Sequence, residues 1–251
     1  MHGLDFLSYS WFLAIAALLL AAFIRGATGF GLSLILTPFM ILIMDPKAAI
    51  PVNLLLAQLS NIVVLVSCFR KVNIKRLLPM FVGSLLGVPV WVYIIIIISS
   101  AILKIFIGGT TILFSILLVF KLTPRFTNER LASGIAGFLC GMLTSAVGLG
   151  APPVILFMHT QKWPKEEIYP GLSAFFLIST GAALIGLSLS GLVTPPILLT
   201  SASLAPGLAI GVFLGMLAFK HVNESYFRIL SVIVVIGAGV LAVLSGLGIM
   251  K

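Results

Sequence analysis

The sequence contains little charge for its length and very little acid. Of its 251 residues, 8% are charged, six are Asp or Glu, and 61% are hydrophobic, with a mean hydropathy of +1.27. An ordinary soluble domain is about 25% charged, and a soluble fold of this size needs polar side chains to cover its surface. The composition therefore excludes a water-soluble enzyme, a nucleic-acid-binding protein and a disordered chain, and it predicts a protein that lies in a bilayer.

Cysteine is also scarce. The two cysteines, Cys68 and Cys140, are too few for a disulfide framework or a four-ligand metal site, so we expect neither a metal nor another cofactor. Residues 1–24 lack the basic start of a signal peptide, so we expect them to remain in the mature protein. The formal net charge of +9 reflects the cytoplasmic bias of Lys and Arg in membrane proteins and does not indicate a nucleic-acid partner.

Long hydrophobic runs fill most of the chain. A membrane-spanning helix needs roughly 20 apolar residues, and the runs of that length are 48–69, 77–98, 101–120, 168–189, 196–219 and 226–249. Two longer runs, 11–44 and 131–158, are interrupted by glycine, hydroxyl residues and proline. The pattern predicts an all-α polytopic membrane protein, in which one broken run and three full spans are followed by the same arrangement again.

Matching landmarks in the two halves support a duplication. A Gly-x-Gly motif, a Pro-Lys pair and a small-residue motif recur in the same order. They are Gly29-Phe-Gly31 with Gly148-Leu-Gly150, Pro46-Lys47 with Pro164-Lys165, and Gly83-x-x-x-Gly87 with Gly211-x-x-x-Gly215. A single Gly-x-x-x-Gly motif is a weak signal, but an ordered series is much harder to obtain by chance. We therefore expect an N-terminal repeat, 1–120, and a C-terminal repeat, 121–251, in one membrane domain.

The distribution of Lys and Arg distinguishes between two topologies. If each broken run crosses once and the N-terminus is inside, eight of these residues lie inside and six outside. If each broken run is a hairpin and both termini are outside, eleven lie inside and only Lys47, Lys104 and Lys251 lie outside. The second arrangement fits the positive-inside tendency better. A helix over 11–24 would also be ~21 Å long, too short to cross a ~30 Å core.

The hairpin topology has a structural consequence. With three full crossings between them, the two hairpins enter the membrane from opposite faces. This arrangement is an inverted repeat, which is common among secondary transporters.

The tips of the two hairpins form the candidate substrate-binding site. Non-helical backbone inside a membrane is tolerated only where protein or a water-filled cavity satisfies its polar groups. Helix N-termini at such tips present N–H groups and a positive dipole end, which favour an anion. The predicted binding residues at the tips are Arg25, Gly26, Thr28, Gly29 and Gly31 in the first half and Thr144, Ser145, Gly148 and Gly150 in the second.

Arg25 is the one charge that we place within the membrane. An intramembrane ionisable residue is a functional candidate by default. Two interpretations stay open: Arg25 binds the anion directly, or it has a structural role and snorkels to an interface or caps a helix end. The second half has no matching base, because Cys140 and Gly141 occupy that region.

Polar side chains on the full spans extend the candidate site. Asn53 and Asn61 are spaced to lie on one helical face, and Ser173, Ser179 and Thr180 lie on the corresponding span of the second half. A buried amide without a hydrogen bond costs roughly 2–7 kcal/mol. We therefore expect Asn53 and Asn61 to face the protein interior, where they bind substrate or join helices.

The acids and histidines lie in the termini, in loops or at the ends of the runs. A proton-coupled pump usually keeps such a group within the bilayer, so the sequence shows no buried proton carrier. An anion does not require one, because an inside-negative potential expels it with about 2.3 kcal/mol per charge per 100 mV. Potential-driven export is physically sufficient.

Three other function classes require sequence features that a transporter does not. An intramembrane protease would need a base for Ser173 in Gly171-Leu-Ser-Ala, and no histidine lies at bilayer depth. A cation channel would require an acidic ring or a carbonyl-lined filter. A thiol-redox or assembly protein would place Cys68 and Cys140 at equivalent positions of the two halves, which they do not occupy. The thiol-redox alternative and a carrier of a different anion stay open.

The two broken runs also resemble a known family. The stretch from Phe23 to Gly31, with Pro38 downstream, resembles the first glycine-rich motif of the TauE/SafE family, and Gly134-x-x-Gly137-x-x-x-Gly141 followed by Gly148-Leu-Gly150-Ala-Pro-Pro153 resembles the second. The resemblance covers nearly the whole chain. Thr28 and Phe30 interrupt a run of consecutive glycines that family members often carry at the first motif.

The resemblance implies a multi-pass protein of the bacterial inner (cell) membrane that exports sulfite or organosulfonates. This substrate class agrees with the anion site predicted at the tips. We therefore expect a secondary transporter that exports a small anion by alternating access, with the bilayer and that anion as its partners.

Overall fold

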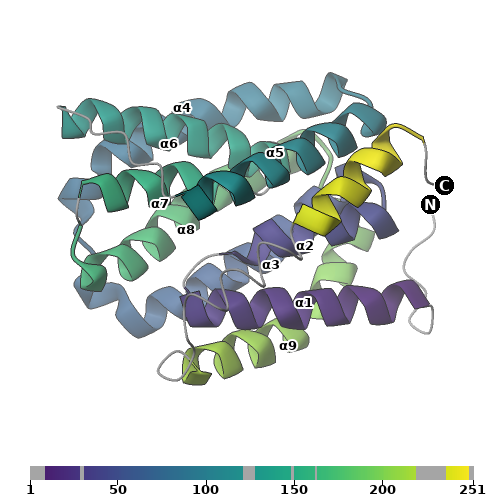
Figure 1. Ribbon diagram of the computed structural model, residues 1–251, viewed down its shortest axis with the longest axis horizontal. Coiled ribbons are helices and arrows are strands. Elements are labelled where there is room, and N and C mark those ends of the chain that lie inside the picture. Colours follow the sequence, from purple (N-terminus) through teal and green to yellow (C-terminus); the bar gives the residue numbers. More distant parts are fainter. Residues whose placement is uncertain are drawn as a thin grey trace.

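The protein is described here by a computed structural model, which places residues 9–28, 31–120, 128–147, 150–161, 163–218 and 236–248. These residues form helices and short connections, with no strand among them (Figure 1). The helices are α1 (Tyr9–Thr28), α2 (Leu32–Ile43), α3 (Pro46–Cys68), a 3-10 turn (Phe69–Lys71), α4 (Ile74–Ile97), α5 (Ser100–Phe120), α6 (Glu129–Val147), α7 (Ala151–Thr160), α8 (Lys165–Leu189), α9 (Pro195–Ala218) and a last helix, Ile236–Gly246.

The predicted all-α class is confirmed for these residues. Four helices, α3, α4, α8 and α9, are long and apolar enough to cross a membrane. Large apolar side chains such as Leu86 and Phe213 are more than 60% exposed on them, as expected for surfaces that contact lipid. Part of the predicted final span, 226–249, lies outside the described residues.

The first broken run corrects one prediction. We expected its first limb to end at residue 24, but α1 continues to Thr28 and has 20 residues, which corresponds to about 30 Å. The helix includes Gly26 because α9 lies directly against it: a Cβ at Gly26 would overlap the carbonyl oxygen of Val212. The break comes later, where Gly31 adopts a φ of 97° before α2 begins, a conformation that glycine adopts readily.

Polar contacts define two ends of the helix bundle. At the Asp45 end, the Lys47 Nζ donates to the Ile96 carbonyl over 3.1 Å and the Ser100 hydroxyl donates to Asp45 over 2.6 Å. At the Arg76 end, the Arg76 Nε lies 2.8 Å from a Glu129 oxygen. The start of α3 and the end of α4 therefore lie together at one end, and the starts of α4 and α6 lie together at the other.

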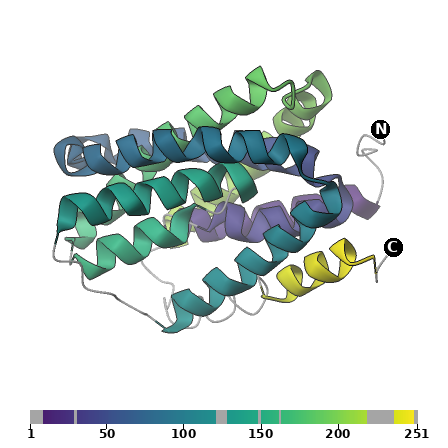
Figure 2. The ribbon, with the colours of Figure 1, turned by 90° about the horizontal axis from the view of Figure 1, so that it is seen from above.

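The two broken runs fold back at these ends. The indole of Trp163, between α7 and α8, donates to Glu129 at the start of α6 over 3.2 Å, so the α6–α7 pair enters and leaves at the Arg76 end. Figures 1 and 2 show the start of α1 at the opposite end of the bundle, beside the N-terminal label. Because α2 runs into Asp45, the α1–α2 pair enters and leaves at the Asp45 end.

Two helix pairs pack at backbone distance through glycine. In the α4–α6 pair, a Cβ at Gly137 would overlap the Met80 carbonyl oxygen, and one at Gly141 would overlap that of Ser84. In the α1–α9 pair, a Cβ at Gly215 would overlap the Phe23 carbonyl oxygen. Small residues allow this approach in membranes, where van der Waals packing holds helices together. Gly83-x-x-x-Gly87 and Gly211-x-x-x-Gly215 thus each contribute to one of these contacts.

Replacing Gly137 by Ala should destabilise the protein, because the added methyl group must push α6 away from α4. Overpacking of this kind costs about 1–3 kcal/mol, which corresponds to a melting temperature about 2–12 °C lower. The measurement is thermal unfolding of the purified chain in detergent.

Gly109→Ala is the matched control, since no atom of the described residues lies within 4 Å of a Cβ at Gly109 in α5. This variant should unfold at or slightly above the native temperature, because Ala favours helix more than Gly. Equal melting temperatures for both variants would contradict the close α4–α6 contact.

Candidate functional site

Buried polar side chains gather where α3 and α8 cross. The Gln58 Nε2 donates to the Leu177 carbonyl over 3.2 Å. Gln58 is the thirteenth of the 23 residues of α3, and Leu177 is the thirteenth of the 25 residues of α8. Because α3 and α8 are both candidate spans, this contact lies close to the middle of the membrane.

Arg25 lies beside this midpoint. Its side chain, in the last turn of α1, is 3% exposed. The Nη2 donates to the Asn61 Oδ1 over 2.6 Å, and the Nε donates to the Ser60 hydroxyl over 3.3 Å. Ser60 and Asn61 follow Gln58 by two and three residues, about 3–4.5 Å along the helix, so the guanidinium is within one turn of the middle of α3.

The hydrogen-bond partners of Arg25 are neutral. Across the described ranges, the ion pairs join Arg76, in the first turn of α4, to Glu129 and to Glu167. The acids in those ranges, Asp45, Glu129, Glu166 and Glu167, stand at helix starts. Arg25 is therefore a buried cation held by an amide and a hydroxyl. Burial of an unpaired charge is costly, so the site favours an added negative charge.

A tyrosine from the second half completes the surroundings of Arg25. The Tyr169 hydroxyl, from the second turn of α8, donates to the carbonyl of Gly26 over 3.4 Å. This contact joins the last turn of α1 to α8. The predicted tip residue Gly26 thus lies between α9 and Tyr169.

The second-half candidates form a separate group. The Ser145 hydroxyl donates to the Gly141 carbonyl over 2.9 Å, and Thr144 Oγ1 lies 3.7 Å from the Cys140 sulfur. Both hydroxyl side chains are at most 2% exposed. A Cβ at Gly150 would overlap the Thr144 hydroxyl oxygen, so the turn into α7 folds directly onto α6. These contacts stay within the α6–α7 hairpin and do not reach Arg25.

The structure separates the two predicted asparagines. Asn61 binds Arg25, whereas Asn53 is 0% exposed and both polar atoms of its side chain lack a hydrogen-bond partner. Gly31 lies at the α2 start. Gly29 and Gly148 lie outside the described residues, as does the side chain of Thr28.

Sequence reasoning missed three residues of this region. Ser60 and Tyr169 surround Arg25, and Ser84 in α4 donates to the Ser179 hydroxyl over 2.7 Å. Ser60 could have been found from its place beside Asn61. Tyr169 and Ser84 come from other helices, and their positions depend on helix packing, which no local sequence pattern indicates.

The described residues contain no group of three His, Cys, Asp or Glu side chains that could hold a metal ion. No disulfide joins Cys68 to Cys140. Arg25, Ser60 and Tyr169 carry N–H or O–H donors, which suit an oxyanion. The chemistry that this arrangement supports is reversible binding of an anion.

The long apolar helices, the two broken hairpins and the buried cation define a multi-pass helical membrane protein. The sequence model of the family described as sulfite exporter TauE/SafE matches residues 14–242. The chain therefore belongs to the TauE/SafE family. No curated protein and no solved structure matches it.

An anion-binding role for Arg25 makes a prediction about Asn61. Asn61→Asp would place a carboxylate against the guanidinium, where it would compete with a bound anion. We expect sulfite affinity to fall at least about 10-fold, as it should in Arg25→Gln, since one charge-assisted hydrogen bond is worth about 1.5–3 kcal/mol. The measurement is calorimetric titration of the purified chain with sulfite.

Ser188→Ala is the control, because its exposed hydroxyl donates to the Leu184 carbonyl within α8 and its removal should not affect affinity. A purely structural Arg25 predicts a different result for Asn61→Asp: a higher melting temperature from the new ion pair, with sulfite affinity unchanged. That outcome would exclude Arg25 as the anion ligand.

Proposed function

We propose that this TauE/SafE protein is a secondary transporter that exports a small anion, sulfite or an organosulfonate, across the cell membrane. The observation that carries the proposal is Arg25, a cation 3% exposed near the middle of the bundle whose hydrogen-bond partners are neutral. A transported anion would supply the missing negative charge. The family description supports sulfite as the first substrate to test.

In the proposed binding mode, Arg25 and Ser60 contact the anion together with N–H groups at the hairpin turns. The guanidinium has five N–H donors in a planar fork that suits an oxyanion. Two of them donate to Ser60 and Asn61. Substrate would displace the Asn61 amide, which therefore holds the donors in place while the site is empty.

The chain also supports an inverted repeat. The offset of 119 residues that separates Gly31 from Gly150 also relates Ser60 to Ser179 and Gln58 to Leu177. The Gln58–Leu177 hydrogen bond thus joins two corresponding positions, as expected near a two-fold axis between repeats. By the same offset, Thr144 is the residue of the second half that corresponds to Arg25.

The helix pairs follow the same correspondence. If α1 corresponds to α6 and α4 to α9, the glycine-packed α1–α9 and α4–α6 pairs are equivalent contacts. Each joins the hairpin of one repeat to a span of the other. The α1–α2 and α6–α7 hairpins open at opposite ends of the bundle, which fits repeats of opposite orientation.

This arrangement suits alternating access. Rocking one repeat against the other about the α3–α8 crossing would open the Arg25 site first to one side and then to the other. The anion needs no coupled proton, since the membrane potential drives it outward.

Sulfite efflux from proteoliposomes tests the function. We expect flux to increase as the loaded side becomes more negative, with a driving force of about 2.3 kcal/mol per net charge per 100 mV, or about 40-fold in the equilibrium ratio. Arg25→Gln should reduce the flux at every potential. Sulfate and sulfoacetate serve as comparators, and Ser188→Ala serves as the matched variant.

Flux of sulfoacetate without sulfite would assign an organosulfonate as substrate. Absence of flux for all three anions, with correctly folded protein in the vesicles, would overturn the substrate class and leave the fold unchanged.

The proposed orientation places the Asp45 end outside. In a Cys68→Ala, Cys140→Ala background, Ser99→Cys should react with a membrane-impermeant maleimide on intact cells, and Lys75→Cys should react only after permeabilisation. Both positions are exposed, so access depends on the side of the membrane. The reverse labelling pattern would invert the proposed topology.

A further inference from the structure

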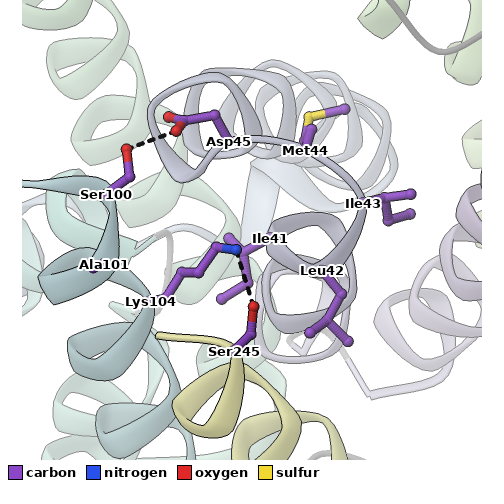
Figure 3. Close-up of a pocket in the computed structure, with 9 residues that line it drawn as sticks. All are labelled: Ile41, Leu42, Ile43, Met44, Asp45, Ser100, Ala101, Lys104 and Ser245. Atoms are coloured by element: carbon purple, nitrogen blue, oxygen red, sulfur yellow. Dashed lines mark hydrogen bonds between the residues drawn. The ribbon is translucent and has the colours of Figure 1, made fainter. Parts of the chain in front are cut away.

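A pocket of about 420 Å³ opens at the Asp45 end of the bundle, and Arg25 is not among the residues that line it (Figure 3). The last turn of α2 forms one wall, with Ile41 and Ile43, and the first turns of α5 form the opposite wall, with Ser100 and Lys104. Ser245 of the last helix closes the base. Figure 3 shows the Lys104 side chain extending between these walls toward α2.

The pocket lies at the edge of the membrane-spanning region. The candidate span in α3 starts at Pro46 and that in α4 ends at Ile97, directly beside the pocket. Exposed apolar side chains on the last turns of α4 and the first turn of α5 include Tyr93, Ile97 and Ile102, each more than half exposed. The pocket is therefore at the depth of lipid headgroups, beside a surface that contacts lipid tails.

Two opposite charges line the pocket without pairing with each other. The Asp45 carboxylate accepts from the Ser100 hydroxyl over 2.6 Å and from the Lys47 backbone N–H over 2.8 Å. The Lys104 Nζ donates to the Ser245 hydroxyl over 3.0 Å. Lys104 keeps two further N–H donors, and Asp45 keeps free lone pairs. Each charge can therefore accept one more partner.

Backbone carbonyls add to the negative side. Ile41 and Ile43 belong to the last turn of α2, whose carbonyl groups have no partner within the helix. The C-terminal end of a helix also carries a partial negative charge. The Asp45 side of the pocket thus suits an ammonium group that can donate several hydrogen bonds, and the Lys104 side suits an acid group.

We propose that this pocket binds a zwitterion with a primary ammonium and a phosphate, as in the headgroup of an amine-bearing phospholipid. The ammonium contacts Asp45 and the end of α2, and the phosphate contacts Lys104 and Ser245. A quaternary ammonium lacks the N–H donors for Asp45, and a glycerol headgroup offers hydroxyl donors but no positive charge for the Asp45 carboxylate. The pocket therefore distinguishes phosphatidylethanolamine from phosphatidylcholine and phosphatidylglycerol.

Competitive lipid retention tests the proposal. The full chain is reconstituted with equal amounts of the dioleoyl forms of these three lipids, and the retained lipids are counted by native mass spectrometry. We expect at least about 5-fold more phosphatidylethanolamine than either competitor, because only its headgroup carries the N–H donors of a primary ammonium for Asp45. The acyl chains of the three lipids are identical, so any difference in retention comes from the headgroups. Asp45→Asn should bring the ratio close to 1, whereas Lys104→Gln should lower the retention of all three lipids, because each of them carries the phosphate.

Both variants keep the local structure. Asn caps a helix as well as Asp does, so the α3 start and the Ser100 hydrogen bond persist in Asp45→Asn. Gln at residue 104 can still donate to Ser245. Lys75→Gln is the control, since it removes an exposed lysine at the Arg76 end and should leave the ratio unchanged.

Free glycerophosphoethanolamine distinguishes a lipid from a soluble zwitterion. If the free compound binds and both variants abolish that binding, while no lipid preference exists, the pocket serves a soluble ligand with the proposed chemistry. Equal retention of all three lipids, with no binding of the free compound, would overturn the proposal. A preference that survives Asp45→Asn, or a total lipid retention that Lys104→Gln leaves unchanged, would also overturn it, because the lipid would then bind elsewhere.

Discussion

The buried guanidinium of Arg25 is the constraint on which the rest of the site depends. A cation near the middle of an apolar bundle is tolerated only where hydrogen bonds or an opposite charge stabilise it. The chain provides an amide and a hydroxyl from adjacent residues of α3, Asn61 and Ser60. Neutral partners reduce the cost of burial without neutralising the charge. An Asp at residue 61 would stabilise the empty site more, and it would also remove the attraction for an anion.

Close helix packing allows Arg25 to reach α3. Gly26, the next residue, lies against the backbone of α9. In the same contact, Gly215 of α9 lies against the Phe23 carbonyl of α1. Because α1 remains helical through Gly26, the side chain of Arg25 leaves the helix in a defined direction. The same kind of packing fixes α6 against α4 through Gly137 and Gly141. Glycine thus determines where the hairpins lie, and the polar residues act within that frame.

The sequence predicted the helices well and the contacts of the site in part. Hydrophobic runs such as 48–69 and 168–189 lie within two or three residues of α3 and α8 at their starts, because composition sets the length of a spanning helix. The predicted end of the first helix was wrong. The local sequence at Arg25 and Gly26 indicates a helix break, but in the structure both residues are helical and Gly26 packs against α9. The pairing of Arg25 with Asn61, and the proximity of Tyr169, depend on packing between distant segments. Local spacing does not encode such contacts.

The difference between the two halves bears on how an anion could leave the proposed site. In the proposed repeat, the 119-residue offset places Thr144 where the first half has Arg25, and Arg25 is the one buried cation among the described residues. Two guanidinium groups near the middle of the membrane would bind an anion tightly and release it slowly. Transport requires binding that is favourable enough for entry and weak enough for exit. A single charge on the tightly packed α1 would combine attraction with release.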